Sequence, residues 1–159
     1  MTKKEKYENL LKQADALLLP NEPVITALAN LSALVFNELD YVSWCGFYLA
    51  KDERLYLGPF QGNVACEFID FGKGVCGTAA RKNETVIVPN VHDFEGHIAC
   101  DDKTNSEIVV PISCKGKIFG VFDLDSYDYA AFDETDKNYL EKVIEILKKN
   151  VRLVNYQLL

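Results

Sequence analysis

The clearest structural signal in the chain is Glu107-Ile-Val-Val-Pro-Ile-Ser-Cys114, Lys115-Gly116 and Lys117-Ile-Phe-Gly-Val-Phe-Asp-Leu-Asp125. Two runs rich in β-branched and aromatic residues meet across a glycine, so the segment predicts a β-hairpin. Further strands are predicted outward from it, in four stretches: Tyr41–Leu49, Arg54–Phe60, Cys66–Phe71 and Thr85–Val88. The stretch 41–49 is apolar on both of its alternating sides, which is typical of a central strand covered on both faces.

Helical periodicity marks both ends of the chain. Apolar residues recur every three to four positions within residues 3–38, with a break at Pro20, and this pattern predicts two helices. The same spacing follows Asp133, a good N-cap residue, and predicts a helix over about 133–156. Long amphipathic helices of this kind could support a homodimer.

The order of these elements predicts the fold class. Two helices come first, then three strands, a short helix after a glycine-rich turn, three more strands and a final helix. Antiparallel strands with helices at the ends indicate an α+β domain, with a sheet over about 41–125 that helices cover mainly on one face. With 159 residues the chain is expected to form a single domain over 1–159, because either half would be too small for a robust core.

Composition argues against several classes of protein. Seventeen basic and 24 acidic residues give a net charge of −7, which disfavours a nucleic acid or an anionic membrane as partner. No run approaches the roughly 20 apolar residues of a membrane span. The first residues form a charged amphipathic pattern rather than a signal peptide. We therefore expect a cytoplasmic protein whose cysteines are not a structural disulfide framework.

The five cysteines fall into two groups by their sequence context. Cys45 and Cys114 lie within apolar strand patterns, and we interpret them as buried packing residues. The others adjoin a turn, a glycine or the long aperiodic stretch 90–105, and are expected to be partly exposed: Cys66, Cys76 and Cys100. Cys76 stands at the entry of the predicted short helix, where unpaired backbone N–H groups could stabilise a thiolate.

Two chemistries compete for these three thiols. The first is a redox set with an attacking thiolate, a resolving thiol and a relay. The second is a metal site, in which His92, His97 and Cys100 would bind the ion together with Cys66 or Cys76. The spacing His-x4-His-x2-Cys lacks the close cysteine pairs of common zinc modules, so the metal is the weaker hypothesis. His92 is expected simply to be solvated.

Acidic residues interrupt the apolar pattern of the hairpin. Asp123 and Asp125 share one face of their strand, and Glu107 begins the partner strand, so the three carboxylates can converge. Such a break in an interior strand marks a candidate functional site, although a strand end fraying into solvent would look the same. Trp44 and Tyr48 share a face of an earlier strand, where they either pack in the core or form the wall of a small acidic pocket. That pocket would suit a cationic amino group or a sulfur-centred dipole better than a phosphate.

Taken together, these residues resemble the free methionine-(R)-sulfoxide reductases, single-domain enzymes of the GAF fold. The resemblance spans nearly the whole chain and is densest in four segments: Ala65–Ala80, Val91–Asp101, Thr104–Pro111 and Ile118–Ser126. A generic GAF sensor would share the hairpin and the glycines but has no need of all three cysteines. The alternative is a stand-alone GAF module that binds a small ligand without transforming it.

The resemblance implies a fold and an activity. The implied fold is a six-stranded antiparallel sheet flanked by helices. The implied activity is reduction of free L-methionine-(R)-S-oxide to L-methionine, without a cofactor and with thioredoxin as the reductant. By resemblance Cys100 is the catalytic thiol, which becomes a sulfenic acid. Cys66 is the main resolving thiol that forms an intramolecular disulfide, and Cys76 is a second candidate or relay.

The resemblance also assigns roles to the other pocket residues. Glu107, Asp123 and Asp125 match carboxylates that engage the substrate, and Trp44 and Tyr48 match its aromatic wall. Crowded carboxyl groups cannot all ionise cheaply, so one of them, with Glu107 and Asp125 as the candidates, can stay protonated and donate to the sulfoxide oxygen. The same acidity should raise the pKa of any thiol that lies among them.

Overall fold

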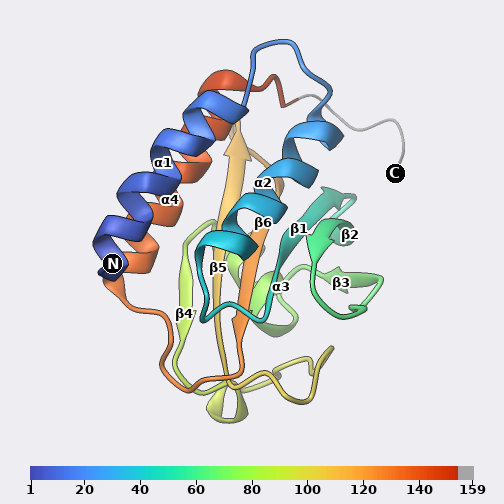
Figure 1. Ribbon diagram of the computed structural model, residues 1–159. Coiled ribbons are helices and arrows are strands. Elements are labelled where there is room, and N and C mark those ends of the chain that lie inside the picture. Colours follow the sequence, from blue (N-terminus) through green and yellow to red (C-terminus); the bar gives the residue numbers. More distant parts are fainter. Residues whose placement is uncertain (154–159) are drawn as a thin grey trace.

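A six-stranded antiparallel sheet in the order β3-β2-β1-β6-β5-β4 forms the centre of the molecule (Figure 1). The computed structural model describes residues 1–153. The strands are β1 (Trp44–Lys51), β2 (Arg54–Gln61), β3 (Phe68–Asp70), β4 (Val86–Val88), β5 (Ser106–Cys114) and β6 (Lys117–Ser126). The predicted hairpin is β5–β6, and the predicted α+β class is confirmed.

Helices lie on both faces of this sheet, but unequally. They are α1 (Lys3–Leu17), α2 (Val24–Glu38), α3 (Gly74–Lys82) and α4 (Glu134–Asn150), with a 3₁₀ turn η1 (Val91–Asp93). Figure 1 shows α1 and α4 side by side, with α2 on the same side of the sheet, whereas the short α3 lies on the other side. None of the described helices is long and apolar enough to cross a membrane.

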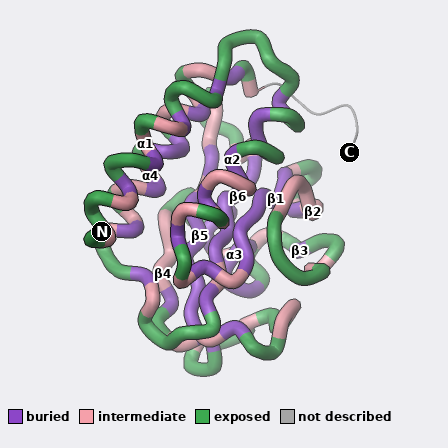
Figure 2. The backbone as a smooth tube through the Cα atoms, viewed as in Figure 1, coloured by how far each residue is buried: buried purple, intermediate pink, exposed green. Residues whose placement is uncertain are grey.

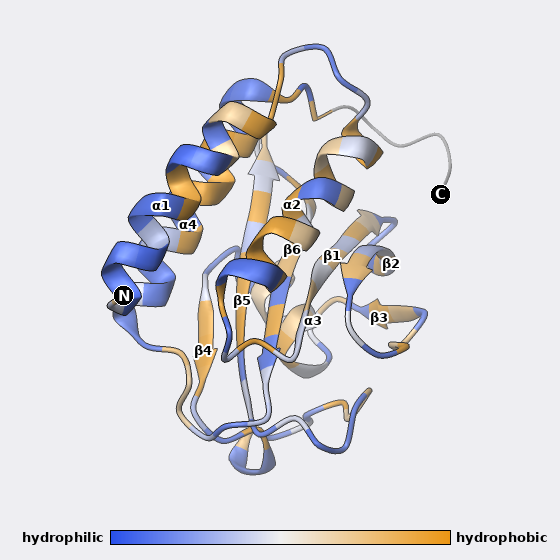
Figure 3. Cartoon of the chain, viewed as in Figure 1, coloured by the Kyte–Doolittle hydropathy of each residue, from blue (hydrophilic) through white to orange (hydrophobic). Residues whose placement is uncertain are grey.

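The sheet separates two apolar clusters. The main core fills the space between α1, α2, α4 and one face of β1, β5 and β6, with Phe47 and Phe122 stacked at its centre. The second cluster, called here the pocket-side cluster, lies between α3 and the opposite face, and includes Trp44, Tyr48 and Cys76. Figure 2 shows β1, β5 and β6 as largely buried, and Figure 3 shows apolar residues on the inner sides of α1 and α4.

Capping fixes the start of both terminal helices. The Thr2 side chain accepts a hydrogen bond from the Glu5 N–H while the Glu5 carboxylate accepts from the Thr2 N–H, which together form a capping box. Asp133 and Asp136 form the same arrangement at the start of α4. Each box satisfies backbone donors that the first helical turn leaves without partners.

The end of α4 differs from the prediction. The helix ends at Asn150, so the expected extension is wrong for residues 151–153, and positions 154–156 lie outside the described residues. Val151 has an extended backbone, donates its N–H to Leu147 O and is only 2% exposed in the main core. Burial of this β-branched side chain takes precedence over the helical spacing, which continues through residue 154 in the sequence.

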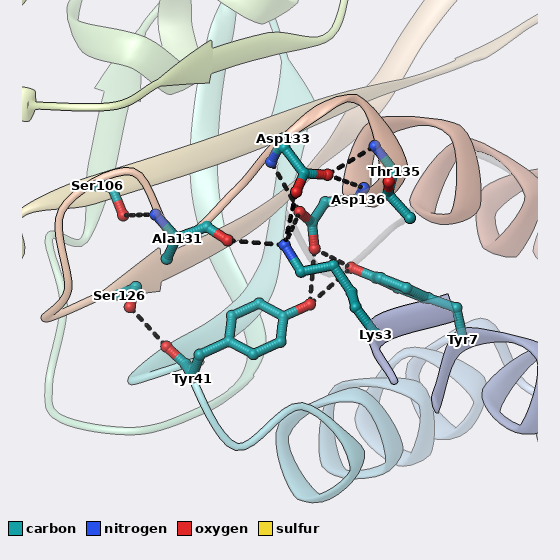
Figure 4. Close-up of polar contacts among 9 residues, drawn as sticks. All are labelled: Lys3, Tyr7, Tyr41, Ser106, Ser126, Ala131, Asp133, Thr135 and Asp136. Carbon is teal, nitrogen blue, oxygen red and sulfur yellow. Dashed lines mark hydrogen bonds and ion pairs between the residues drawn. The ribbon is translucent and has the colours of Figure 1, made fainter. Parts of the chain in front are cut away.

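A hydrogen-bond network around one buried carboxylate joins the first helix to the start of the last one (Figure 4). The Asp136 carboxylate is fully buried and accepts from Tyr7 OH at 2.8 Å, Tyr41 OH at 2.6 Å and Lys3 Nζ at 2.6 Å. A buried charge is tolerated when it is paired and hydrogen-bonded in this way. The network therefore locks α1 to α4 and to the segment that enters β1.

Candidate active site

The candidate site lies on the pocket-side face, where β1, β5 and β6 run side by side. Asp125 on β6 pairs with Trp44 on β1 and with Glu107 on β5, so these three side chains form one row across the sheet. Asp123 lies in the neighbouring row on the same face, where it pairs with Gly46 on β1 and with Val109 on β5. Because alternate residues of a strand share a face, the pattern Asp-Leu-Asp places both aspartates on the pocket side.

These side chains line a cavity of about 40 Å³ beneath α3. Its wall is formed by carboxylates, aromatic rings and the loops that carry the cysteines: Trp44, Tyr48, Val64, Ala65, Ile69, Gly74, Val75, Cys76, His97, Ile98, Cys100, Asp101, Thr104, Glu107, Asp123 and Asp125. The convergence of the three acidic residues is therefore observed, and β6 does not fray there. Among the predicted redox and substrate-binding residues only Cys66 is not part of the lining, and the candidate metal ligand His92 is also absent from it.

Burial controls the protonation of the three carboxyl groups. Glu107 and Asp123 are each only 6% exposed. Burial, and then the neighbouring charge of Asp125, raises the pKa of Glu107 well above its usual range. Burial, and then the charge of Glu107, raises the pKa of Asp123. Burial, and then the charge of Asp123, raises the pKa of Asp125. The site thus favours a protonated carboxyl group, which can serve as a proton donor.

Two polar atoms in this lining lack a hydrogen-bond partner among the described residues. They are Asp123 Oδ1 and Thr104 Oγ1, both buried. A buried acceptor or hydroxyl left without a partner is costly, and in a pocket it indicates where a bound polar molecule would make contact. The site is therefore prepared for a ligand with hydrogen-bond donors.

The structure joins Cys66 and Cys100 in a disulfide with Cα atoms 5.4 Å apart. Cys66 lies in the segment between β2 and β3, and Cys100 lies in the long loop between η1 and β5. Both residues are half-buried, as expected for reactive thiols, and Cys100 lines the cavity. The disulfide therefore lies at the wall of the acidic pocket, to which Cys100 contributes.

Cys76 differs from the expectation of a partly exposed, stabilised thiolate. It is 3% exposed, in the first turn of α3, and its Sγ lies 3.9 Å from Glu107 Oε1. Burial, and then the charge of Asp123, raises the pKa of this thiol. The helix packs the side chain against the acidic part of the sheet, so the surroundings favour the neutral thiol and the expectation is wrong.

The two remaining cysteines do not line the pocket. Cys45 is fully buried in the main core, as its strand pattern predicts. Cys114 is only half-buried, because it pairs with Lys117 at the turn of the β5–β6 hairpin. Its interpretation as a buried packing residue is therefore wrong.

The aromatic wall also holds one of the cysteine loops. Trp44 is 5% exposed and donates its Nε1–H to Asn63 O at 3.0 Å, and Tyr48 is 1% exposed and donates its hydroxyl to Cys66 O at 2.9 Å. Their ring centroids lie 6.1 Å apart. The two residues therefore shape the pocket and fix the backbone next to Cys66.

Several lining residues were not singled out by the sequence. His97 had been considered only as a metal ligand; its Nε2 lies 3.7 Å from Glu107 Oε2, and burial lowers its pKa. Thr104, Asp101 and Ile98 were not identified at all. The segments that carry the family resemblance include all three, but the residues give no separate signal because the loop has no periodicity.

The structure does not bring together the ligands of the hypothetical metal site. His92 Nε2 lies 2.9 Å from Asn105 Oδ1, and Cys100 is bonded to Cys66, so the proposed ligand set is not assembled. Within residues 1–153 the group whose ligand atoms come close enough for a metal is Cys76, Glu107 and Asp123, all within 4.8 Å of one another. The same three groups also suit a protonated network with no ion.

Comparison with known proteins places this geometry in a family. Residues 25–147 match the GAF domain family. The chain is 42% identical to the free methionine-R-sulfoxide reductase of Escherichia coli, over 99% of this chain and 95% of the relative. It is 46% identical to the enzyme of the same name from Saccharomyces cerevisiae, over 94% and 88% of the two chains.

The chain belongs to the free methionine-R-sulfoxide reductase family. A solved structure of the Neisseria meningitidis free methionine-R-sulfoxide reductase in complex with its substrate superposes on this family member with a TM-score of 0.91. The two chains are 40% identical, over 94% of this chain and 90% of that one. The family member is therefore an oxidoreductase built on the GAF fold, as the resemblance in its sequence implied.

Proposed function

We propose that the protein reduces free L-methionine-(R)-S-oxide to L-methionine through Cys100, with Cys66 as the resolving thiol. The observation that carries this proposal is the position of the Cys66–Cys100 pair at an enclosed acidic pocket whose carboxyl groups have raised pKa values. A sulfoxide oxygen leaves only when it is protonated, so a nucleophilic sulfur and a proton donor must reach the substrate together.

In the first step the Cys100 sulfur attacks, and the sulfoxide oxygen is transferred to it. Methionine sulfoxide and a Cys100 thiol thereby give methionine and a Cys100 sulfenic acid, and the sulfoxide sulfur gains two electrons that the cysteine sulfur loses. Glu107 and Asp125, opposite each other across the sheet, are the candidates to hold the proton that the oxygen takes up.

In the second step the Cys66 thiol condenses with the sulfenic acid. A disulfide forms and one molecule of water leaves. Thioredoxin, through its own dithiol, then reduces the disulfide and restores both cysteines. Such recycling fits a cytoplasmic setting, where thiols are kept reduced. Cys76, with its buried neutral thiol, serves at most as a second resolving group.

The pocket also accounts for recognition of a free amino acid. An ionised carboxylate among Glu107, Asp123 and Asp125 would bind the substrate ammonium, and the unpartnered Asp123 Oδ1 is well placed to accept from it. Trp44 and Tyr48 offer apolar ring surface to the thioether chain, because sulfur–aromatic contacts are favourable.

Replacing Cys100 by serine tests the proposal. Cys100→Ser should abolish methionine formation from free methionine-(R)-sulfoxide in a thioredoxin-coupled assay, while its circular dichroism spectrum remains that of the wild type. Cys114→Ser, which changes a half-buried cysteine far from the pocket, is the matched control and should keep full activity. Sustained turnover by Cys100→Ser would refute the assignment.

A further inference from the structure

Three side chains from separate segments meet beside the disulfide. Tyr127 OH donates to Asp101 Oδ2 at 3.1 Å, and Asn63 Nδ2 donates both to that oxygen at 3.4 Å and to Tyr127 OH at 3.2 Å. Asn63 precedes Cys66 in the loop after β2, Asp101 directly follows Cys100, and Tyr127 directly follows β6. The three hydrogen bonds thus connect the loops of both cysteines to the end of the strand that carries the pocket aspartates.

Each member of this cluster is itself held in place. The Asn63 carbonyl accepts from Trp44 Nε1, the second Asp101 oxygen accepts from the Lys103 N–H at 3.0 Å, and the Tyr127 carbonyl accepts from Asn105 Nδ2 at 2.7 Å. The Lys103 N–H bond, followed by the bonds from Tyr127 and Asn63, lowers the pKa of Asp101, so its carboxylate stays ionised. A charged acceptor makes these hydrogen bonds stronger than neutral ones.

We propose that Asn63, Asp101 and Tyr127 form a latch that positions the Cys66 loop against the Cys100 loop and so promotes closure of the Cys66–Cys100 disulfide. These are positioning residues that act through the two cysteines. This proposal rests on the proposed function, because disulfide closure is the resolving step of the proposed reaction. The latch itself affects only the equilibrium between the dithiol and the disulfide.

The disulfide and the latch hydrogen bonds connect the same two loops, so each makes the other easier to form. Holding two thiols close together raises the effective concentration of one at the other, and thereby favours the disulfide. By thermodynamic linkage, hydrogen bonds that the disulfide helps to form must stabilise the disulfide by the same factor. The bonds are exposed to solvent, so loss of one hydroxyl should weaken the disulfide by only roughly three- to tenfold.

Tyr127→Phe is the sharpest test, because it removes one hydroxyl and keeps the ring. Tyr129→Phe is the matched control, since Tyr129 is 60% exposed and its hydroxyl makes no hydrogen bond to the described residues. Each purified protein is equilibrated with mixtures of reduced and oxidised glutathione. One oxidised glutathione accepts two electrons from the Cys66–Cys100 dithiol, which gives one protein disulfide and two molecules of reduced glutathione. The fraction carrying the Cys66–Cys100 bond is then determined by thiol alkylation and mass mapping.

We expect the equilibrium constant for disulfide formation to fall three- to tenfold in Tyr127→Phe, which corresponds to a reduction potential roughly 14–30 mV higher. Asn63→Ala should shift it in the same direction, and Tyr129→Phe should leave it within twofold of the wild type. A change below twofold in Tyr127→Phe, or an equal change in Tyr129→Phe, would overturn the latch. The measurement uses no methionine sulfoxide, so it can succeed or fail independently of the proposed activity.

Discussion

Glu107 on β5 and Asp125 on β6 are direct cross-strand neighbours, and both side chains line the same cavity. Two like charges at opposed positions of an antiparallel pair destabilise the sheet, and burial increases the cost. Placing Asp123 one row away adds a third acidic group. The strand register itself thus creates carboxyl groups that retain a proton, and this has consequences for stability as well as for chemistry.

Asp123→Asn should stabilise the protein above the ordinary pKa of aspartate. The pKa of Asp123 is raised in the folded chain by burial and then by Glu107, so above about pH 4 the folded state binds more protons than the unfolded state. The free energy of unfolding then falls as the pH rises, by up to about 1.4 kcal/mol per pH unit for one group. Asparagine does not titrate, so the variant lacks the part of this pH-dependent loss of stability that comes from Asp123.

Thermal unfolding between pH 4 and pH 9 measures the effect. We expect Asp123→Asn to have a higher Tm than the wild type at neutral pH and a shallower decline toward alkaline pH. Asp102→Asn, at an exposed position in the long loop, should follow the wild-type curve. Equal slopes for Asp123→Asn and the wild type would contradict the proposed role of burial.

The two candidate resolving thiols should behave differently on mutation. Cys66→Ser should still form about one methionine per chain and then stop, because the Cys100 sulfenic acid loses the partner to which it is bonded in the structure. Cys76→Ser should keep multiple turnover, since the Cys76 thiol is buried and its pKa is raised. Methionine yield per chain, with and without thioredoxin, distinguishes the two. Full turnover by Cys66→Ser would instead identify Cys76 as the resolving thiol.

The pocket should discriminate against a blocked amino group. N-acetylation removes the charge that the buried carboxylates would bind, and it leaves Asp123 Oδ1 without a donor. A site whose buried polar groups are left unpaired rejects an analogue strongly. We therefore expect kcat/KM for N-acetylmethionine-(R)-sulfoxide to be at least about a hundredfold lower than for the free amino acid. Steady-state kinetics on both substrates measures the ratio. Comparable values would mean that the ammonium group is not bound.

Removing Asp136 should destabilise the fold without touching the pocket. Asp136→Ala leaves the hydroxyls of Tyr7 and Tyr41 and the ammonium of Lys3 without their shared buried acceptor (Figure 4). Breaking a buried network from one side typically costs about 3–5 kcal/mol. Glu8→Gln, which breaks the exposed Lys4–Glu8 pair, should cost less than about 0.5 kcal/mol. Urea denaturation measures both, and similar losses would contradict the difference in burial.

The sheet could be predicted because its signals are local. The alternation in β6 shows which residues share a face, and Gly116 marks the hairpin turn, so the grouping of Asp123 with Asp125 follows from the sequence. The end of α4 could not be predicted in the same way. Val151 is held by packing in the main core, a tertiary contact that helical periodicity does not report.

The loops of the site were beyond sequence reasoning for the same cause. The stretch before β5 has no periodicity, and its course depends on contacts such as Asp101 with Tyr127 and Ile98 with Gly74. Cys76 was misjudged because exposure at a helix entry depends on what the helix packs against. Gly77 brings α3 so close to Asp70 that an added Cβ would lie 2.4 Å from Asp70 O, and Cys76 faces Glu107 on β5 and Asp123 on β6.

The separation of the two apolar clusters by the sheet bears on how this domain can evolve. The main core draws on α1, α2 and α4, whereas the pocket-side cluster draws on α3 and the cysteine loops. Substitutions on opposite sides of a sheet that share no partner combine additively in their effect on stability. Selection can therefore alter which molecule is held under α3 while the remainder of the domain keeps its sequence and its capacity to fold.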